Sequence, residues 1–104
     1  MKLDWLTSFR DLRAMTPIER AARALCALDG QPEDAPVADG LMWHGYMPQA
    51  LVVIEALHEP SARMSEAGAE LVRYVSPEQP LPAHQGDAAN IWRIMIDAMR
   101  KDIP

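Results

Sequence analysis

Prolines place the strongest constraint on how this sequence can fold, because a proline lacks the backbone N–H and fits a helix only in its first turn. Nine prolines are distributed over the 104 residues. Pro17 and Pro48 suit the first turns of helices, and Pro60 ends one. Most of the others lie in residues 31–40 and 76–86, together with glycine and acidic residues, so these stretches are predicted to be loops. The chain is therefore expected to form short helices separated by loops.

Two helices are predicted before the first loop. A short one is expected at about residues 4–12, where large apolar residues recur every three positions. The clearest helix start follows at Thr16, because Glu19 lies three residues later and its carboxylate can return to the cap N–H in a capping box. This pattern predicts a helix over residues 17–29, closed by Gly30 in the left-handed conformation. Its apolar stripe should comprise Ile18, Ala21, Ala22, Leu25 and Leu28.

The next helix is predicted over residues 48–58, while residues 41–47 remain ambiguous. Apolar residues surround most of this helix, which predicts a central and largely buried element. Ser61 is then expected to cap a further helix, in which Gly68 allows close approach to a neighbouring helix. The contact stripe of that helix should comprise Met64, Ala67, Gly68, Leu71, Val72 and Val75.

A terminal helix is predicted to start at the cap Asp87 and to run to about Lys101. Its last residues are basic, which suits the negative end of the helix dipole. The side chains expected to face inward are Ile91, Trp92, Met95, Ala98 and Met99. Alanine, leucine and methionine are common and strand-like alternation is scarce. We therefore expect one all-α domain over residues 1–104, a compact bundle of four to five helices.

The sequence argues against membranes and disulfides. No stretch approaches the roughly 18–20 consecutive apolar residues of a membrane helix, and the N-terminus does not resemble a secretory signal. We expect a cytoplasmic protein, in the host cell if a phage encodes it. The one cysteine, Cys26, excludes an internal disulfide, and its apolar neighbours predict a buried side chain.

The charge is acidic and unevenly distributed. The formal net charge is −5, the wrong sign for general attraction to phosphate backbones or anionic lipids. Residues 31–90 carry nine acidic and only two basic side chains. This segment is either a solvated surface or a set of carboxylates presented to a basic partner.

Motifs for catalysis or metal binding are scarce. Three histidines and one cysteine have no zinc-ligand spacing. Glu55 and His58 have the Glu-x-x-His spacing of di-iron bundles, but no second such pair exists, so a solvent-facing acid and histidine is the better interpretation. No serine lies in a G-x-S-x-G turn, and no phosphate-binding glycine motif is present. We therefore expect no enzyme, no catalytic residue, no cofactor and no metal.

Two surface patterns remain. Glu55 with Glu59, and Glu66 with Glu70, are spaced as i and i+4 pairs, which normally form a solvated acidic face. The short connection between the first two helices would permit a helix-turn-helix, with Arg20 and Arg23 exposed on its second helix. The acidic charge of the chain argues against that DNA-binding alternative.

Several segments, taken in order, carry a resemblance. They are Arg23-Ala24-Leu25-Cys26, Asp29-Gly30, Trp43, Tyr46, Ile54-Glu55-Ala56-Leu57-His58-Glu59-Pro60-Ser61, Met64, Ala67-Gly68, Ile91-Trp92-Arg93 and Met95-Ile96-Asp97-Ala98-Met99. Over about residues 20–100 the chain resembles a group of small uncharacterised helical proteins encoded by bacterial phages and prophages, with the pattern "ARAxC … ALxEPSxxMxxAG … WxxMIDA". His58 departs from that pattern, in which an arginine is expected, and residues 1–15 lie outside it.

The resemblance implies a phage accessory protein and no particular activity. We expect a non-enzymatic protein that acts by protein–protein interaction, with the acidic segment as its contact surface. One form is an anti-defence protein, such as an anti-CRISPR, in which Glu55, Glu59, Glu66 and Glu70 imitate phosphates in a basic groove. The alternatives are a DNA-binding regulator and a structural or oligomeric role in the phage. A protein partner is expected, membrane and nucleic acid are not, and homo-oligomerisation is left open.

Overall fold

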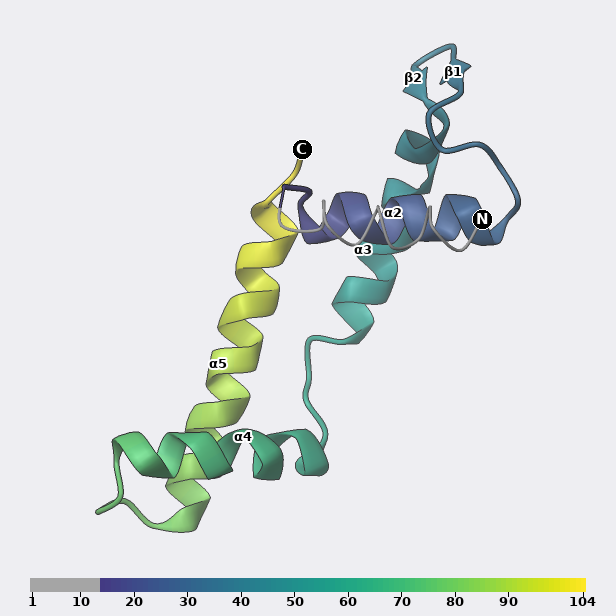
Figure 1. Ribbon diagram of the computed structural model, residues 1–104. Coiled ribbons are helices and arrows are strands. Elements are labelled where there is room, and N and C mark those ends of the chain that lie inside the picture. Colours follow the sequence, from purple (N-terminus) through teal and green to yellow (C-terminus); the bar gives the residue numbers. More distant parts are fainter. Residues whose placement is uncertain (1–13) are drawn as a thin grey trace. The chain divides into compact units, whose positions relative to one another are not determined.

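The computed structural model describes residues 14–104, so the helix expected at residues 4–12 lies outside the described residues. The described chain is mainly helical (Figure 1). It divides into two units, the first formed by the described residues up to Val53 with Met99–Pro104, and the second by Ile54–Ala98. None of the helices in residues 14–104 is long and apolar enough to cross a membrane.

The first unit begins with α2, Pro17–Leu28, and its start confirms the predicted cap. The Oγ1 atom of Thr16 accepts the backbone N–H of Glu19 at 3.1 Å. The carboxylate of Glu19, which was expected to return to the cap N–H, accepts a hydrogen bond from Arg23. Gly30 follows the helix with φ +74°, as predicted for a residue that ends a helix in the left-handed region.

A small β-hairpin is the one addition to the mainly helical fold within residues 14–104. Strands β1, Pro36–Val37, and β2, Gly40–Leu41, pair antiparallel, with Pro36 opposite Leu41 and Val37 opposite Gly40. Gly40 has φ +136°, a conformation that favours glycine at the end of the tight turn. The ambiguous segment after the hairpin forms a 3-10 helix, η1, Met42–Tyr46.

The core of the first unit lies between α2 and η1. It consists of Ala22, Cys26, Trp43 and Ala50. The burial of Cys26 confirms the prediction, whereas Leu28, expected in the same stripe, is 84% exposed. The buried residues of α2 recur every four positions from Ile18, and Leu28 falls on another side of the helix.

Helix α3, Met47–Ala56, is shorter than predicted and is not surrounded by protein. Ala50 and Ile54 are buried, four residues apart, but Val52, Val53 and Leu57 are at least half exposed. The apolar residues that surround most of this segment therefore predicted a helix correctly. The prediction that the helix is largely buried was wrong.

The second unit contains α4, Ala62–Val75, and most of α5, Leu81–Lys101. Ser61 caps α4 as predicted, because its Oγ accepts the N–H of Met64 at 3.2 Å. Helix α5 starts six residues before the predicted cap Asp87, which lies inside the helix. Pro82 is the second residue of α5, a position in the first turn that proline tolerates, so it does not exclude a helix there.

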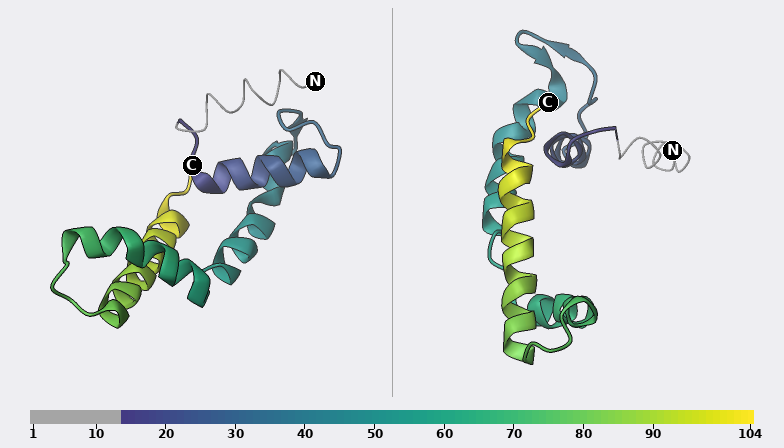
Figure 2. Two further views of the ribbon diagram at one scale, coloured as in Figure 1. Left: turned by 60° about the horizontal axis from the view of Figure 1, so that its bottom comes forward. Right: turned by 90° about the vertical axis from the view of Figure 1, so that its left-hand side faces the viewer.

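The left view of Figure 2 shows α4 lying across α5, and the right view shows α4 nearly end-on beside α5. The crossing depends on small residues. A Cβ atom added to Gly68 would lie 2.7 Å from the Cβ of Ala88. This confirms the prediction that Gly68 permits close helix approach.

Candidate functional site

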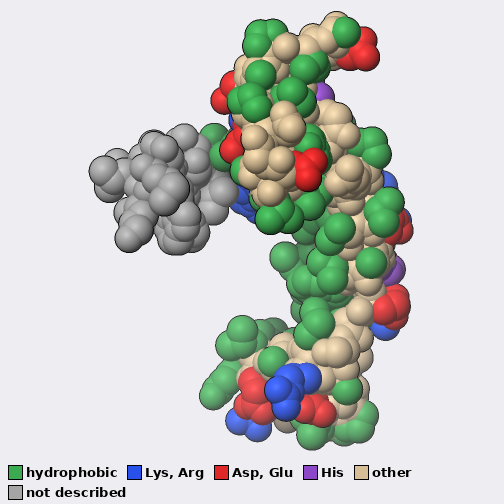
Figure 3. Space-filling view, turned by 90° about the vertical axis from the view of Figure 1, so that its right-hand side faces the viewer, with side chains coloured by type: hydrophobic (Ala, Val, Ile, Leu, Met, Phe, Trp, Pro, Cys, Tyr) green, Lys and Arg blue, Asp and Glu red, His purple; other side chains and the backbone are tan. Residues whose placement is uncertain are grey.

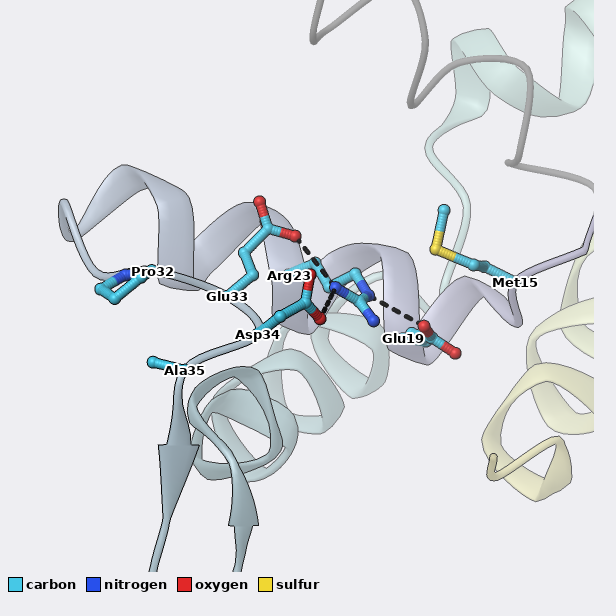
Figure 4. A pocket seen from close by; sticks show the side chains of 7 residues that line it. All are labelled: Met15, Glu19, Arg23, Pro32, Glu33, Asp34 and Ala35. Carbon is cyan, nitrogen blue, oxygen red and sulfur yellow. Dashed lines mark hydrogen bonds and ion pairs between the residues drawn. The ribbon is translucent and has the colours of Figure 1, made fainter.

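A cluster of charged side chains in the first unit surrounds Arg23 (Figure 4). The Nε atom of Arg23 donates to Oε2 of Glu19 at 2.8 Å, one turn earlier on α2. Its Nη1 atom lies 2.9 Å from Oδ1 of Asp34 and 3.4 Å from Oε1 of Glu33, both in the loop after the helix. The guanidinium carbon is also 4.9 Å from the centroid of the Trp43 ring, within cation–π range.

The electrostatics of this cluster fix Arg23 in its charged form. Burial by itself lowers the pKa of Arg23, but the hydrogen bonds that Arg23 donates to Glu19, Asp34 and Glu33 outweigh burial and raise the pKa above its ordinary value. A cavity of about 690 Å³ lies beside the cluster and is lined by Met15, Glu19, Arg23, Pro32, Glu33, Asp34 and Ala35. Because the donors of Arg23 already bind carboxylates of the same chain, the cluster ties the loop to α2.

The same contacts bear on the DNA-binding alternative. Arg23 was expected to be exposed, but its side chain is only 22% accessible and is bound by three carboxylates. Arg20, expected beside it on the outer face, is half-buried and also interacts within the chain. These positions correct the expectation of two exposed arginines on α2.

The Tyr46 hydroxyl and the Cys26 thiol of the first unit both have raised pKa values. Tyr46 donates its hydroxyl to Oδ2 of Asp29 at 2.6 Å, and this hydrogen bond, with burial, raises the pKa of Tyr46 to about 12. Burial raises the pKa of the Cys26 thiol, and the carboxylates of Glu33 and Asp29 raise it further. A thiol with a raised pKa is a poor nucleophile at neutral pH.

A second polar cluster in the other unit joins the turn before α4 to α5. Arg93 binds Glu59 with Nη2 to Oε1 at 2.9 Å and with Nε to both carboxylate oxygens at 3.2 Å. Hydrogen bonds from Arg93, and then from His58, hold the pKa of Glu59 below its ordinary value. The hydrogen bond with Glu59 likewise raises the pKa of Arg93.

His58 is part of this cluster and was interpreted wrongly from the sequence. Its Nε2 lies 3.0 Å from Oδ1 of Asp97, and its Nδ1 lies 3.1 Å from Oε2 of Glu59. The residue is half-buried and contacts these two carboxylates, whereas a solvent-facing pair with Glu55 was expected. Both ring nitrogens are therefore occupied by the fold.

The four glutamates predicted as an interaction site are all exposed, but they do not form two matched pairs. Helix α3 ends at Ala56, so Glu55 and Glu59 do not share a helical face. Glu59 is bound by Arg93, and Glu55 also interacts within the chain. Glu66 and Glu70 lie on successive turns of α4 and share one side of it. Glu70 has a salt bridge of 3.3 Å with Arg73, which is exposed and therefore weak.

The most extensive candidate surface is apolar. We call it the α4–α5 face and define it by six large side chains on the two crossing helices, all between 41% and 83% exposed: Met64, Leu71, Val75, Ile91, Ile94 and Met95. Most of them belong to the stripes that were expected to face inward, so the expected burial is wrong. In the lower part of Figure 3, hydrophobic side chains of this unit lie at the surface beside acidic and basic ones.

Two grooves lie along this face. The first has a volume of about 310 Å³ and is lined by Pro60, Met64, Ser65, Ala67, Gly68, Ala88, Ile91, Trp92 and Met95. The second has a volume of about 350 Å³ and is lined by Val72, Val75, Ser76, Asp87, Asn90, Ile91 and Ile94. Ile91 borders both grooves. Trp92 is fixed at the edge of the first because its Nε1 donates to the carbonyl of Leu57 at 2.7 Å.

One buried polar group was missed by sequence reasoning. His84 was assigned to a loop, but it lies in the first turn of α5 and is 3% exposed. Its Nδ1 has no hydrogen-bond partner among the described residues. An adjoining cavity of about 460 Å³ is lined by His84 with Arg73, Tyr74, Pro77, Gln79 and Leu81. No sequence signal could have indicated its burial, because that depends on where α5 starts.

Within residues 14–104, no group of three or more histidine, cysteine, aspartate or glutamate side chains is arranged to hold a metal ion.

Comparisons with protein-family models, with curated proteins and with solved structures found no match to this chain.

Proposed function

We propose that this protein is a non-enzymatic accessory protein that acts by binding another protein. The observation that carries the proposal is the exposure of the large apolar side chains on the α4–α5 face. A group of large apolar side chains that stay exposed together is more often a protein–protein contact surface than a freely solvated surface. The side chains best suited to chemistry are engaged in the fold: Arg23 and His58 bind carboxylates of the same chain, and Cys26 is buried with a raised pKa.

The exposed carboxylates of α4 supply a second contact in this proposal. Glu66 and Glu70 lie next to one another on the helix, in a segment with a large excess of acidic residues. Such carboxylates attract a basic surface and suit an anti-defence inhibitor, such as an anti-CRISPR, that occupies a nucleic-acid groove. The resemblance to phage and prophage proteins supports this form, with the host cytoplasm as the place of action. Glu59 contributes less to such a contact, because Arg93 already neutralises it.

The test is affinity capture with tagged full-length protein from lysates of phage-infected or lysogenic bacteria. Wild type should retain one partner in stoichiometric amount, and the double variant Glu66→Gln/Glu70→Gln should retain several-fold less, because rim charges speed association. Glu78→Gln is the matched control, since Glu78 is exposed in the loop after α4. The captured partner is then purified and its binding to each variant is measured directly.

Three results would decide against the proposal. Failure of wild type to retain any stoichiometric protein in either lysate contradicts protein binding as the function. If Glu66→Gln/Glu70→Gln binds the partner as tightly as wild type, the proposed acidic contact is contradicted. Salt-dependent binding of duplex DNA that is lost in Arg20→Ala/Arg23→Ala would instead favour the DNA-binding regulator.

A further inference from the structure

We propose that the α4–α5 face is covered by the same face of a second copy of this chain, so that the protein is a symmetric homodimer. This inference rests on the proposed function, in which that face is a protein–protein contact, and it names the partner that covers it. A two-fold dimer places one surface patch against its own copy, which is the commonest arrangement of soluble oligomers.

The way α4 and α5 cross leaves this face uncovered by the two helices themselves. Gly68 and Ala88 bring the backbones close together at one place. Away from that place the helices diverge, because they cross instead of running side by side (Figure 2). Leu71 and Val75 lie towards the end of α4, beyond the crossing, and are 73% and 83% exposed. Two crossing helices cannot cover these residues with one another.

The second unit buries little within itself. Its buried apolar residues are Ile54, Ala69, Ala89 and Ile96, and two of these four are alanines. A unit of this size seldom forms a sufficient core alone. Two α4–α5 pairs provide four helices around one core, the number found in the commonest helical bundles. The compact bundle that the sequence predicts is then completed by two copies.

The apolar area of the face matches what a dimer needs. At about 32 Å² for each buried CH₂ group, the exposed parts of the six side chains amount to about 450 Å² for each copy. A standard interface buries about 800 Å² on each partner, and in homodimers about 65% of that area is apolar, which is roughly 520 Å². The six side chains therefore supply most of the apolar area of one standard homodimer interface.

The distribution of charge on the face suits a second copy. No side chain that lines the first groove is ionisable, and the second groove has Asp87 alone. Two identical faces therefore meet with few like charges opposed, which is the main penalty against self-association of an acidic protein. Ile91 borders both grooves and so lies at the centre of the face, where the buried residues of an interface contribute most.

The experiment is sedimentation equilibrium of the purified full-length protein over a range of micromolar concentrations. We expect wild type to have twice the chain mass of 11.6 kDa. Ile94→Glu should raise the dimer dissociation constant at least about 100-fold, since a charge on each copy becomes buried without a partner. Ile103→Glu is the matched control, because Ile103 is an isoleucine of similar exposure, 53% against 66%, that lies outside the face.

Each outcome is decisive. A wild-type chain that is monomeric at all concentrations overturns the proposal, as does an Ile94→Glu variant that is folded by circular dichroism and as dimeric as Ile103→Glu. If Ile94→Glu does not fold, Ile94→Ala is used, and an unchanged dissociation constant overturns the proposal. The affinity capture described above tests the proposed function separately. A monomer that still captures a protein partner contradicts the homodimer but not the proposed function. A dimer that captures no protein contradicts the proposed function.

Discussion

At the scale of single residues, long-range ion pairs hold the connecting segments of this protein in place. Arg23 binds Glu33 and Asp34, ten and eleven residues further along, and thereby attaches the start of the first loop to α2. The guanidinium carbon also lies over the Trp43 ring, 4.9 Å from its centroid. A lysine would keep the charge but lose both the fork of donors and the guanidinium contact with the ring.

Replacing Arg23 should therefore destabilise the first unit. We expect Arg23→Ala to lower the free energy of unfolding by about 1–2 kcal/mol, because charge-assisted hydrogen bonds are lost and partly exposed pairs are screened by solvent. Arg23→Lys should recover less than half of this loss. Urea unfolding followed by circular dichroism measures both values. Arg63→Ala, at an exposed position on α4, is the control, and an equal effect of that change would show that Arg23 has no special role.

Tyr46 gives a prediction about pH. Its pKa in the folded chain is about 12, above the ordinary value of 10.0, since its hydroxyl donates to Asp29. A raised pKa in the folded state stabilises the fold fully below pH 10, and this stabilisation is lost as the pH rises from 10 through 12. Absorbance titration of the phenolate, taken as wild type minus Tyr46→Phe, should give a pKa near 12. In Asp29→Ala it should fall towards 10, and no change there would contradict the assigned hydrogen bond.

Contacts within three residues could be predicted from the sequence, and contacts between distant residues could not. The caps at Thr16 and Ser61 involve the N–H groups of Glu19 and Met64, so the residue types and spacing were sufficient. His58 meets Asp97 across 39 residues, and its partner depends on how the turn is placed against α5. The burial of His84 was missed for the same reason.

At the scale of secondary-structure elements, the crossing of α4 and α5 is the feature most sensitive to a single methyl group. A Cβ at position 68 would lie 2.7 Å from the Cβ of Ala88, and neither atom can rotate away. The helices must therefore separate to accept a side chain there.

Gly68→Ala should lower the free energy of unfolding by about 1 kcal/mol, because the overpacking exceeds the gain in helix propensity. Gly86→Ala should have the opposite sign, a gain of about 0.5–1 kcal/mol, since Gly86 lies inside α5 and a Cβ there meets nothing within 4 Å. Thermal unfolding of both variants measures the difference. If Gly68→Ala is as stabilising as Gly86→Ala, the close crossing does not exist in solution.

The turn before α4 should weaken in acid. The pKa of Glu59 in the folded chain lies below its ordinary value of 4.5, so Glu59 stabilises the fold above pH 4.5 and loses this effect as the pH falls through the folded pKa. Between about pH 5 and pH 3, the free energy of unfolding measured with urea should fall more in wild type than in Glu59→Gln. Glu78→Gln, outside the cluster, should follow wild type, and identical slopes for all three proteins would contradict the Glu59–Arg93 pairing.

Periodicity predicted most of the helices but not which of their faces are buried. The stripe on α4 shares one side of the helix as expected, yet Leu71 and Val75 are exposed, because spacing identifies a face without identifying what covers it. The start of α5 was predicted at Asp87 because three nearby prolines indicated a loop. Pro80 and Pro82 instead precede and occupy the first turn, where they cost the helix nothing.

At the scale of the whole molecule, the apolar face and the exposed carboxylates have separate uses in the proposals made above. The α4–α5 face joins two copies, and Glu66 and Glu70 bind the foreign partner. A dimer would present two sets of these carboxylates, so a target with two basic sites would bind it more tightly than a monomer.

The most direct measurement is amide hydrogen exchange of the wild-type chain at a low and a high protein concentration. Association through the α4–α5 face predicts that exchange slows at the higher concentration in residues 64–75 of α4 and 88–95 of α5, while α2 exchanges at the same rate in both samples. Exchange that does not depend on concentration anywhere in these two helices, or that slows in α2 instead, would contradict the assignment of this face as the contact surface.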